Sequence, residues 1–177
     1  MTQSSSASTP ADTHVASTAL VIAAIGVAAI LGAFYFQYFM KLAPCPLCLE
    51  QRIPYYIGIP LALIVAFAAW RRAPGWLVGL GFAALAIVFL VGAGLGVYHA
   101  GIEWKFWPGP TECSGPLGQI GGSGGLLEQM QTTSVVRCDE AAWRLMGISL
   151  AGYNVLISLF LAAQAASCAR GFFTRDS

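Results

Sequence analysis

The sequence predicts an all-α membrane protein, in which four transmembrane helices form an antiparallel bundle with one long extracytoplasmic loop. Hydrophobic residues make up 57 % of the 177 residues and charged residues only 10 %, too few charges to cover a soluble domain. Four apolar runs are each near the length of about 20 residues that crosses the hydrocarbon core of a bilayer. These runs cover residues 15–40, 53–70, 76–100 and 143–166. A helix is the expected form of each run, because it satisfies its own backbone hydrogen bonds in lipid.

The first run predicts a retained helix rather than a cleaved signal peptide. Residues 1–14 contain no Lys or Arg, and the apolar run is longer than the core of a signal peptide. Their Ser and Thr content predicts a short disordered tail. We therefore expect three parts: a tail at 1–14, a membrane domain at 15–166 with the loop 101–142 inserted, and a tail at 167–177.

The connections between the runs predict the orientation. Four spans put both termini and the turn at 71–75 on one side, and the connections 41–52 and 101–142 on the other. The adjacent Arg71 and Arg72 form the densest basic cluster beside a span, which indicates the cytoplasmic side. Both termini are therefore expected in the cytoplasm. A net charge of +1 offers no basic surface for nucleic acid.

The cysteines are unevenly distributed over the two sides. Cys45, Cys48, Cys113 and Cys138 all fall in the connections opposite the termini, and Cys168 alone lies at the other face. Four thiols on one face, an even number, indicate disulfides in an oxidising compartment. This agrees with the orientation given by the arginine turn.

The first cysteine pair is a CxxC motif, Cys45-Pro-Leu-Cys48, directly before the second span. Zinc sites use the same spacing, but a tetrathiolate would need Cys113 and Cys138, which a long Gly-rich stretch separates. We therefore expect no metal. Two thiols this close form a readily exchanged disulfide, so the spacing favours redox chemistry.

The surroundings of Cys48 favour a reactive thiolate. The prolines at 44 and 46 place Cys48 near a helix N-terminus, where unpaired N–H groups favour negative charge. If helix continues, Arg52 lies four residues on, over the same face. Both features lower a thiol pKa. Two alternatives remain: Arg52 extends to the membrane interface, or Pro54 delays the regular helix until residue 53.

The second pair, Cys113 and Cys138, bounds a loop that contains Gly-Gly-Ser-Gly-Gly at 121–125. A disulfide between them would staple the loop, and loop-closure entropy would make it worth about 3 kcal/mol. A loop this rich in glycine also gives a partner's thiols access to the pair. The sequence leaves both roles open.

Together these features resemble the bacterial disulfide bond formation protein B family, DsbB. The resemblance covers the four spans and both cysteine pairs, and its most specific parts are two motifs. They are Cys45-Pro-Leu-Cys48-Leu-Glu-Gln-Arg52, and Cys138 followed by Trp143-Arg-Leu-Met-Gly-Ile-Ser-Leu-Ala-Gly-Tyr153. Family members also carry a histidine at the end of the third span, a position that His99 fits.

The resemblance implies a disulfide relay in the bacterial inner membrane. A reduced, DsbA-like thioredoxin-fold partner in the periplasm would be oxidised by the Cys113–Cys138 disulfide, with Cys113 forming the mixed disulfide. Cys138 would then exchange with Cys45. Cys48 would pass two electrons to a quinone, ubiquinone or menaquinone, bound by Cys48, Arg52 and His99. Cys168 matches no redox position of the family.

Three alternatives stay beside this interpretation. From residues alone, His99 is also expected at the interface as the polar end of its span. A non-catalytic membrane scaffold would use the disulfides only to staple its loops. An enzyme similar to vitamin K epoxide reductase would share the thiol and quinone chemistry, but its CxxC lies near the end of a late helix, whereas this one opens the second span.

Overall fold

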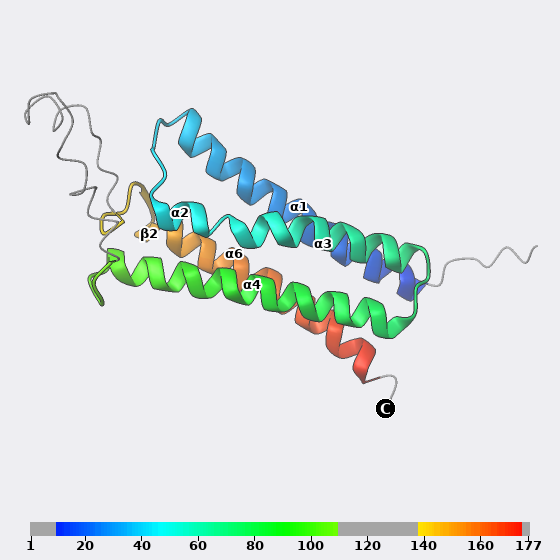
Figure 1. Ribbon diagram of the computed structural model, residues 1–177. Helices are drawn as coiled ribbons and strands as arrows, with labels where there is room; N and C mark the ends of the chain where they lie inside the picture. The colour runs from blue at the N-terminus through cyan, green and yellow to red at the C-terminus, as the bar shows by residue number, and fades with distance from the viewer. Residues whose placement is uncertain (1–9, 110–137, 175–177) are drawn as a thin grey trace, which may run out of the picture.

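The computed structural model describes residues 10–109 and 138–174. Four long helices dominate it: α1 (Pro10–Tyr38), α3 (Ile53–Trp70), α4 (Gly75–Glu103) and α6 (Leu150–Phe173). Figure 1 shows α1 starting and α6 ending at one end of the bundle, with the short elements at the other end. Those short elements are α2 (Pro46–Glu50), β1 (Arg144–Leu145) and β2 (Ile148–Ser149).

The predicted all-α bundle with four spans is confirmed. Four helical segments of the described chain are long and apolar enough to cross a membrane: His14–Tyr38, Pro46–Trp70, Gly75–Glu103 and Leu150–Phe172. At most 44 % of the most apolar stretch of any span is buried inside the protein. The remaining apolar surface suits contact with lipid, because lipid tails do not penalise exposed Leu, Ile and Phe.

The second span is divided into two helices. α2 ends at Glu50 and α3 begins at Ile53, with Pro54 in its first turn. Proline has no N–H to donate and its fixed φ suits the start of a helix. The expectation that Pro54 delays the regular helix to residue 53 is therefore confirmed. The break places Arg52 at the junction instead of within one continuous helix.

The start of the fourth span differs from the prediction. The sequence predicted a helix from residue 143, whereas β1 and β2 form a small antiparallel hairpin and α6 begins only at Leu150. Met146 and Gly147 both have positive φ, at 51° and 83°, as a two-residue hairpin turn requires. Ser149 then caps α6, because its hydroxyl accepts a hydrogen bond from the Gly152 N–H.

The other helix ends also differ from the apolar runs. α1 begins at Pro10, inside the segment for which a tail was predicted, and α4 continues past residue 100 to Glu103. α6 continues past residue 166 to Phe173. Helical hydrogen bonding does not depend on apolar side chains, so a helix can extend beyond the hydrophobic run.

Glycines allow the helices to approach closely at the core. A Cβ on Gly96 of α4 would lie 2.8 Å from a methyl carbon of Val155 on α6. A Cβ on Gly58 of α3 would lie 2.7 Å from the ring of Phe89, whose side chain is fully buried. Such contacts are typical of helix packing in membranes, where small residues bring backbones together.

Replacing Gly58 by alanine is expected to destabilise the bundle by about 1–3 kcal/mol, because the new methyl overlaps a ring that has no room to move. Thermal unfolding of the detergent-solubilised protein measures this effect. The matched control is Gly32→Ala in α1, where an added Cβ meets no atom within 4 Å and stability should stay equal or rise. Equal stability of the two variants would contradict the close packing of α3 on α4.

Candidate active site

Two free thiols meet at the start of the second span. Cys45 is the N-cap of α2, and its Sγ accepts a hydrogen bond from the Cys48 backbone N–H at 3.2 Å. Pro46 occupies the first turn of α2, which fixes the helix start directly after Cys45. Cys45 is 2 % exposed and Cys48 is half-buried, and both are free thiols. The local sequence therefore turns both sulfurs toward the interior at the hairpin end of the bundle.

Cys45 is the member of the pair that keeps its proton. Its hydrogen bond with the Cys48 side chain and its burial raise the pKa of the Cys45 thiol. A negative charge shared by the pair therefore resides on Cys48, chiefly because of the hydrogen bond between the two side chains.

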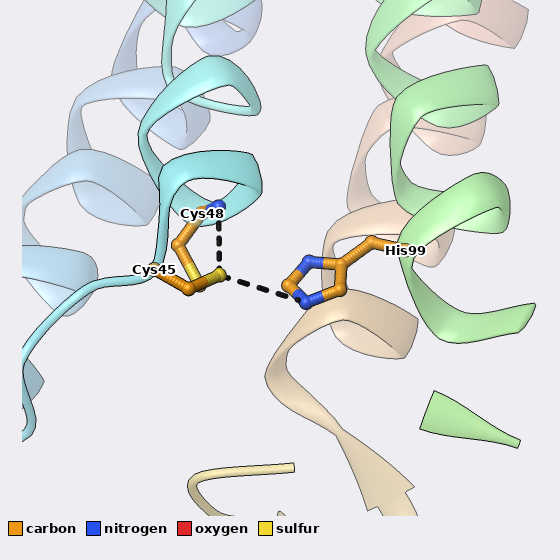
Figure 2. A group of neighbouring side chains, drawn as sticks. All are labelled: Cys45, Cys48 and His99. Carbon is orange, nitrogen blue, oxygen red and sulfur yellow. Dashed lines mark hydrogen bonds between the residues drawn. The ribbon is translucent and has the colours of Figure 1, made fainter. Parts of the chain in front are cut away.

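His99 faces the thiol pair from the neighbouring helix. Figure 2 shows its imidazole reaching from α4 toward Cys45, with His99 Nε2 at 3.7 Å from Cys45 Sγ. His99 is 4 % exposed, so it lies inside the protein and not at an interface in contact with water. The alternative of a merely interfacial histidine does not agree with this burial.

A chain of buried amides and hydroxyls holds the other side of the imidazole. The Gln51 side-chain amide lies 2.5 Å from His99 Nδ1, and Asn154 Nδ2 of α6 donates to Gln51 Oε1 at 2.6 Å. The Tyr55 hydroxyl donates to Asn154 Oδ1 at 2.7 Å. Polar groups inside a membrane span are costly unless paired, so such a network marks a functional region.

Replacing Asn154 by leucine is expected to disconnect this network. Gln51 Oε1 loses its donor in a buried place, and the Tyr55 hydroxyl keeps only Ser158 Oγ as a partner, which should cost about 1–3 kcal/mol of stability. The His99 ring should lose its fixed orientation as well. Thermal unfolding and the histidine NMR signals measure the two effects. Ser167→Ala is the control, since that exposed hydroxyl bonds only to its own helix.

Arg52 lies beside the thiols but is held by the first helix. Its Nη1 donates to Gln37 Oε1 at 2.8 Å, and its guanidinium carbon lies 5.2 Å from the centroid of the Phe34 ring. Only 9 % of Arg52 is exposed, and it interacts electrostatically with Cys48. These contacts favour a fixed, buried cation over an arginine that extends to the interface.

These side chains border one cavity of about 540 Å³ between α1, α3 and α6. Most of its wall is apolar and comes from helix residues such as Ile25, Ala29, Phe36, Ala151 and Ile157. Its thiols, amides and charged groups gather at the thiol end: Gln37, Cys45, Cys48, Gln51, Arg52, His99, Glu103, Glu140 and Asn154. An apolar chamber with a few polar groups at one end suits a ligand with a polar head and an apolar body.

Cys138 lies next to the first cysteine pair. It is fully buried in one cluster with Cys45, Leu47 and Ile102, against which Cys48 also packs. Its backbone hydrogen-bonds to His99, and its sulfur is disulfide-bonded. Lys105 fixes the neighbouring residue, because its Nζ lies 2.7 Å from the Asp139 carboxylate. Cys113 lies outside the described residues, so its pairing with Cys138 stays a prediction.

The structure thus brings together Cys45, Cys48, Arg52, His99 and Cys138, while Cys168 lies on α6 as a half-buried free thiol. Sequence reasoning missed three members of the site: Gln51, Asn154 and Glu103. A signal was present for Asn154, an isolated amide inside an otherwise apolar run.

Comparison with known proteins points to one family. The family model described as disulfide bond formation protein DsbB matches residues 16–168. The chain is 30 % identical over 148 residues to disulfide bond formation protein B of Xanthomonas oryzae, covering 82 % of this chain and 83 % of that protein. It is 29 % identical over 156 residues to disulfide bond formation protein B of Marinobacter nauticus, covering 81 % and 86 %. An uncharacterized protein of Rickettsia prowazekii is 25 % identical over 144 residues, covering 80 % of each chain. No solved structure gives a significant match.

Proposed function

The chain belongs to the DsbB family of membrane proteins involved in disulfide bond formation, and we propose that it is a quinone-dependent protein-dithiol oxidase. In this role it reoxidises a periplasmic, DsbA-like thiol oxidase and passes the electrons to a membrane quinone. One observation carries the proposal: two free thiols, a buried arginine and a buried histidine border the polar end of a single apolar cavity.

The distribution of thiols and disulfide supports a relay between the two cysteine pairs. Cys138 is disulfide-bonded, and Cys45 and Cys48 carry two free thiols beside it. In the relay, the partner's dithiol is oxidised as the Cys113–Cys138 disulfide is reduced. The Cys138 thiolate then attacks Cys45 of a Cys45–Cys48 disulfide and expels Cys48 as thiolate. Attack of Cys113 on Cys138 restores their disulfide and leaves both CxxC thiols reduced.

The cavity fits a quinone by its chemistry. The apolar wall suits a hydrophobic ring and tail, and Arg52 and His99 are the groups that would donate hydrogen bonds to a quinone oxygen. Re-forming the Cys45–Cys48 disulfide releases two electrons and two protons, which a bound quinone takes up. The Arg52 guanidinium stabilises negative charge both on Cys48 and at the oxygen that it faces.

We also propose the orientation and organisation predicted from the sequence. The cysteine end of the bundle lies in the periplasm, both termini lie in the cytoplasm, and the protein resides in the bacterial inner membrane. Residues 15–166 constitute the membrane domain. The Arg71 and Arg72 turn at the opposite end supports this orientation through the positive-inside rule.

The test mixes the purified protein with a reduced thioredoxin-fold dithiol and a quinone, and follows quinone absorbance. The proposal predicts catalytic reduction of the quinone, and an unreduced quinone contradicts it. In a second arm, Cys138→Ala is mixed with the oxidised partner. The free Cys113 thiolate should attack the partner's disulfide and accumulate as a mixed disulfide, with the partner's other sulfur released as a thiol. A scaffold whose disulfides only staple loops captures no partner.

A further inference from the structure

We propose that the reduced site also binds a thiophilic divalent cation such as Zn²⁺, with Cys45, Cys48, His99 and Glu103 as its four ligands. The proposal concerns metal binding by the dithiol and does not require the chain to be an oxidase. It differs from the tetrathiolate considered from sequence, because two of its donors come from α4 and no donor comes from the second cysteine pair.

Three of the four donor atoms already lie close together, and the fourth ligand, Glu103, lies beside His99. The Sγ atoms of Cys45 and Cys48 and a ring nitrogen of His99 all lie within 4.8 Å of one another. Cys45 Sγ is 3.7 Å from His99 Nε2, and Glu103 Oε1 is 3.8 Å from the same nitrogen. Zinc bonds of about 2.0–2.3 Å in a tetrahedron separate neighbouring donors by about 3.4–3.8 Å. His99 Nε2 therefore has one sulfur and one carboxylate oxygen at near-ideal distances.

Glu103 provides independent support for a bound cation. Its side chain is 4 % exposed, and its Oε2 is a buried oxygen with no hydrogen-bond partner among the described residues. A buried carboxylate oxygen without a partner is costly. Glu103 already interacts with Ser149 and, electrostatically, with Arg144, and a metal ion bound between Glu103 and the thiols would give its unpaired Oε2 a partner.

The hydrogen bonds around His99 become those of a metal-binding histidine if the Gln51 amide rotates. A histidine that binds metal through Nε2 carries its proton on Nδ1 and donates it to a nearby acceptor. Gln51 Nε2, a donor, adjoins Nδ1 in this structure, and rotation of the amide would present Oε1 to that proton instead. The Asn154 amide rotates with it, since it can donate to the Tyr55 and Ser158 hydroxyls as readily as it accepts.

Charge and proton balance restrict binding to the reduced state. A divalent cation displaces one proton from each thiol and forms two metal–sulfur bonds, with no change in oxidation state. Two thiolates, one carboxylate and the cation leave one negative charge, which the buried Arg52 on the same cavity compensates. A Cys45–Cys48 disulfide has no thiolate to offer. On the proposed function, the cation would therefore hold the site reduced and block the relay.

The test titrates Cd²⁺, a spectroscopic substitute for Zn²⁺, into the full-length Cys113→Ser/Cys138→Ser protein, which keeps only Cys45, Cys48 and Cys168. The reduced protein should bind one Cd²⁺ per chain with the ultraviolet absorption of two cadmium–thiolate bonds. His99→Ala should weaken binding about 100-fold and Glu103→Gln about 10-fold. Cys168→Ser should change nothing.

Oxidising Cys45 and Cys48 to a disulfide supplies an arm that needs no further substitution, and it should abolish binding. Equal affinity of the oxidised and reduced proteins overturns the proposal, as does undiminished affinity in His99→Ala or Glu103→Gln. None of these readouts involves quinone reduction. The metal proposal can therefore be tested even if the protein turns out not to be a quinone-dependent oxidase.

Discussion

Replacing Cys48 by alanine is expected to reduce the rate of quinone reduction by about 1,000-fold or more, to the uncatalysed background. The raised pKa of Cys45 leaves the reactive negative charge of the pair on Cys48. Cys48 also borders the apolar cavity beside the buried Arg52. Without its sulfur, Cys45 has no neighbour with which to close the disulfide that releases two electrons. Quinone absorbance in the presence of excess reduced partner measures the effect.

The matched control is Cys168→Ala. Cys168 is also a free thiol, but it belongs to α6 and does not border the cavity. Its removal should leave the rate unchanged. A Cys48→Ala protein that reduces quinone at the wild-type rate would show that electrons leave through another group. That result would also remove the reason for placing the quinone at this cavity.

Hydrophobicity predicted the number of spans well but not where each begins. The apolar run that starts at Trp143 continues without interruption into α6, yet its first residues form a hairpin. Apolar composition reports what surrounds a segment, whereas Met146 and Gly147 decide its backbone by adopting positive φ. The Ser149 cap then sets the helix start. Proline gave a clearer signal in the second span, because its missing N–H acts locally and α3 begins beside it.

The site was predictable only as far as its chemistry is local in sequence. The CxxC motif and Arg52 lie within eight residues, so one short segment is enough to predict a thiol pair beside a cation. Glu103 lies four residues after His99 on α4, a spacing that places the two side chains on one face of the helix. Asn154 belongs to α6, and nothing in the sequence says that this helix meets Gln51. That contact depends on helix packing around glycines such as Gly96, which is a property of the bundle.

Replacing Arg52 by methionine is expected to raise the KM for quinone about 10–100-fold, the loss of one charge-assisted hydrogen bond. The free energy of unfolding should not fall together with the affinity for quinone. The hydrogen-bond and ring partners of Arg52 in the described chain are neutral, the Gln37 amide and the Phe34 ring, and its anionic neighbour, Cys48, is charged only as a thiolate. When Cys45 and Cys48 form a disulfide, a cation that is 9 % exposed and held by neutral groups incurs a desolvation cost that no thiolate offsets. Methionine fills a similar volume without that cost, so thermal stability should be equal or higher.

Two comparisons separate this role from simple packing. Arg52→Lys keeps the charge but not the planar guanidinium, so it should restore part of the affinity for quinone. Arg71→Met is the matched control, because Arg71 also lies over a phenylalanine ring, with its guanidinium carbon 5.7 Å from the centroid of Phe67, but in the exposed turn at the other end. It should leave KM unchanged. A protein that loses stability and quinone affinity together on Arg52→Met would mean that Arg52 holds α1 against the bundle. If quinone affinity falls while the fold remains equally stable, the buried charge is retained for its action on the quinone and on Cys48.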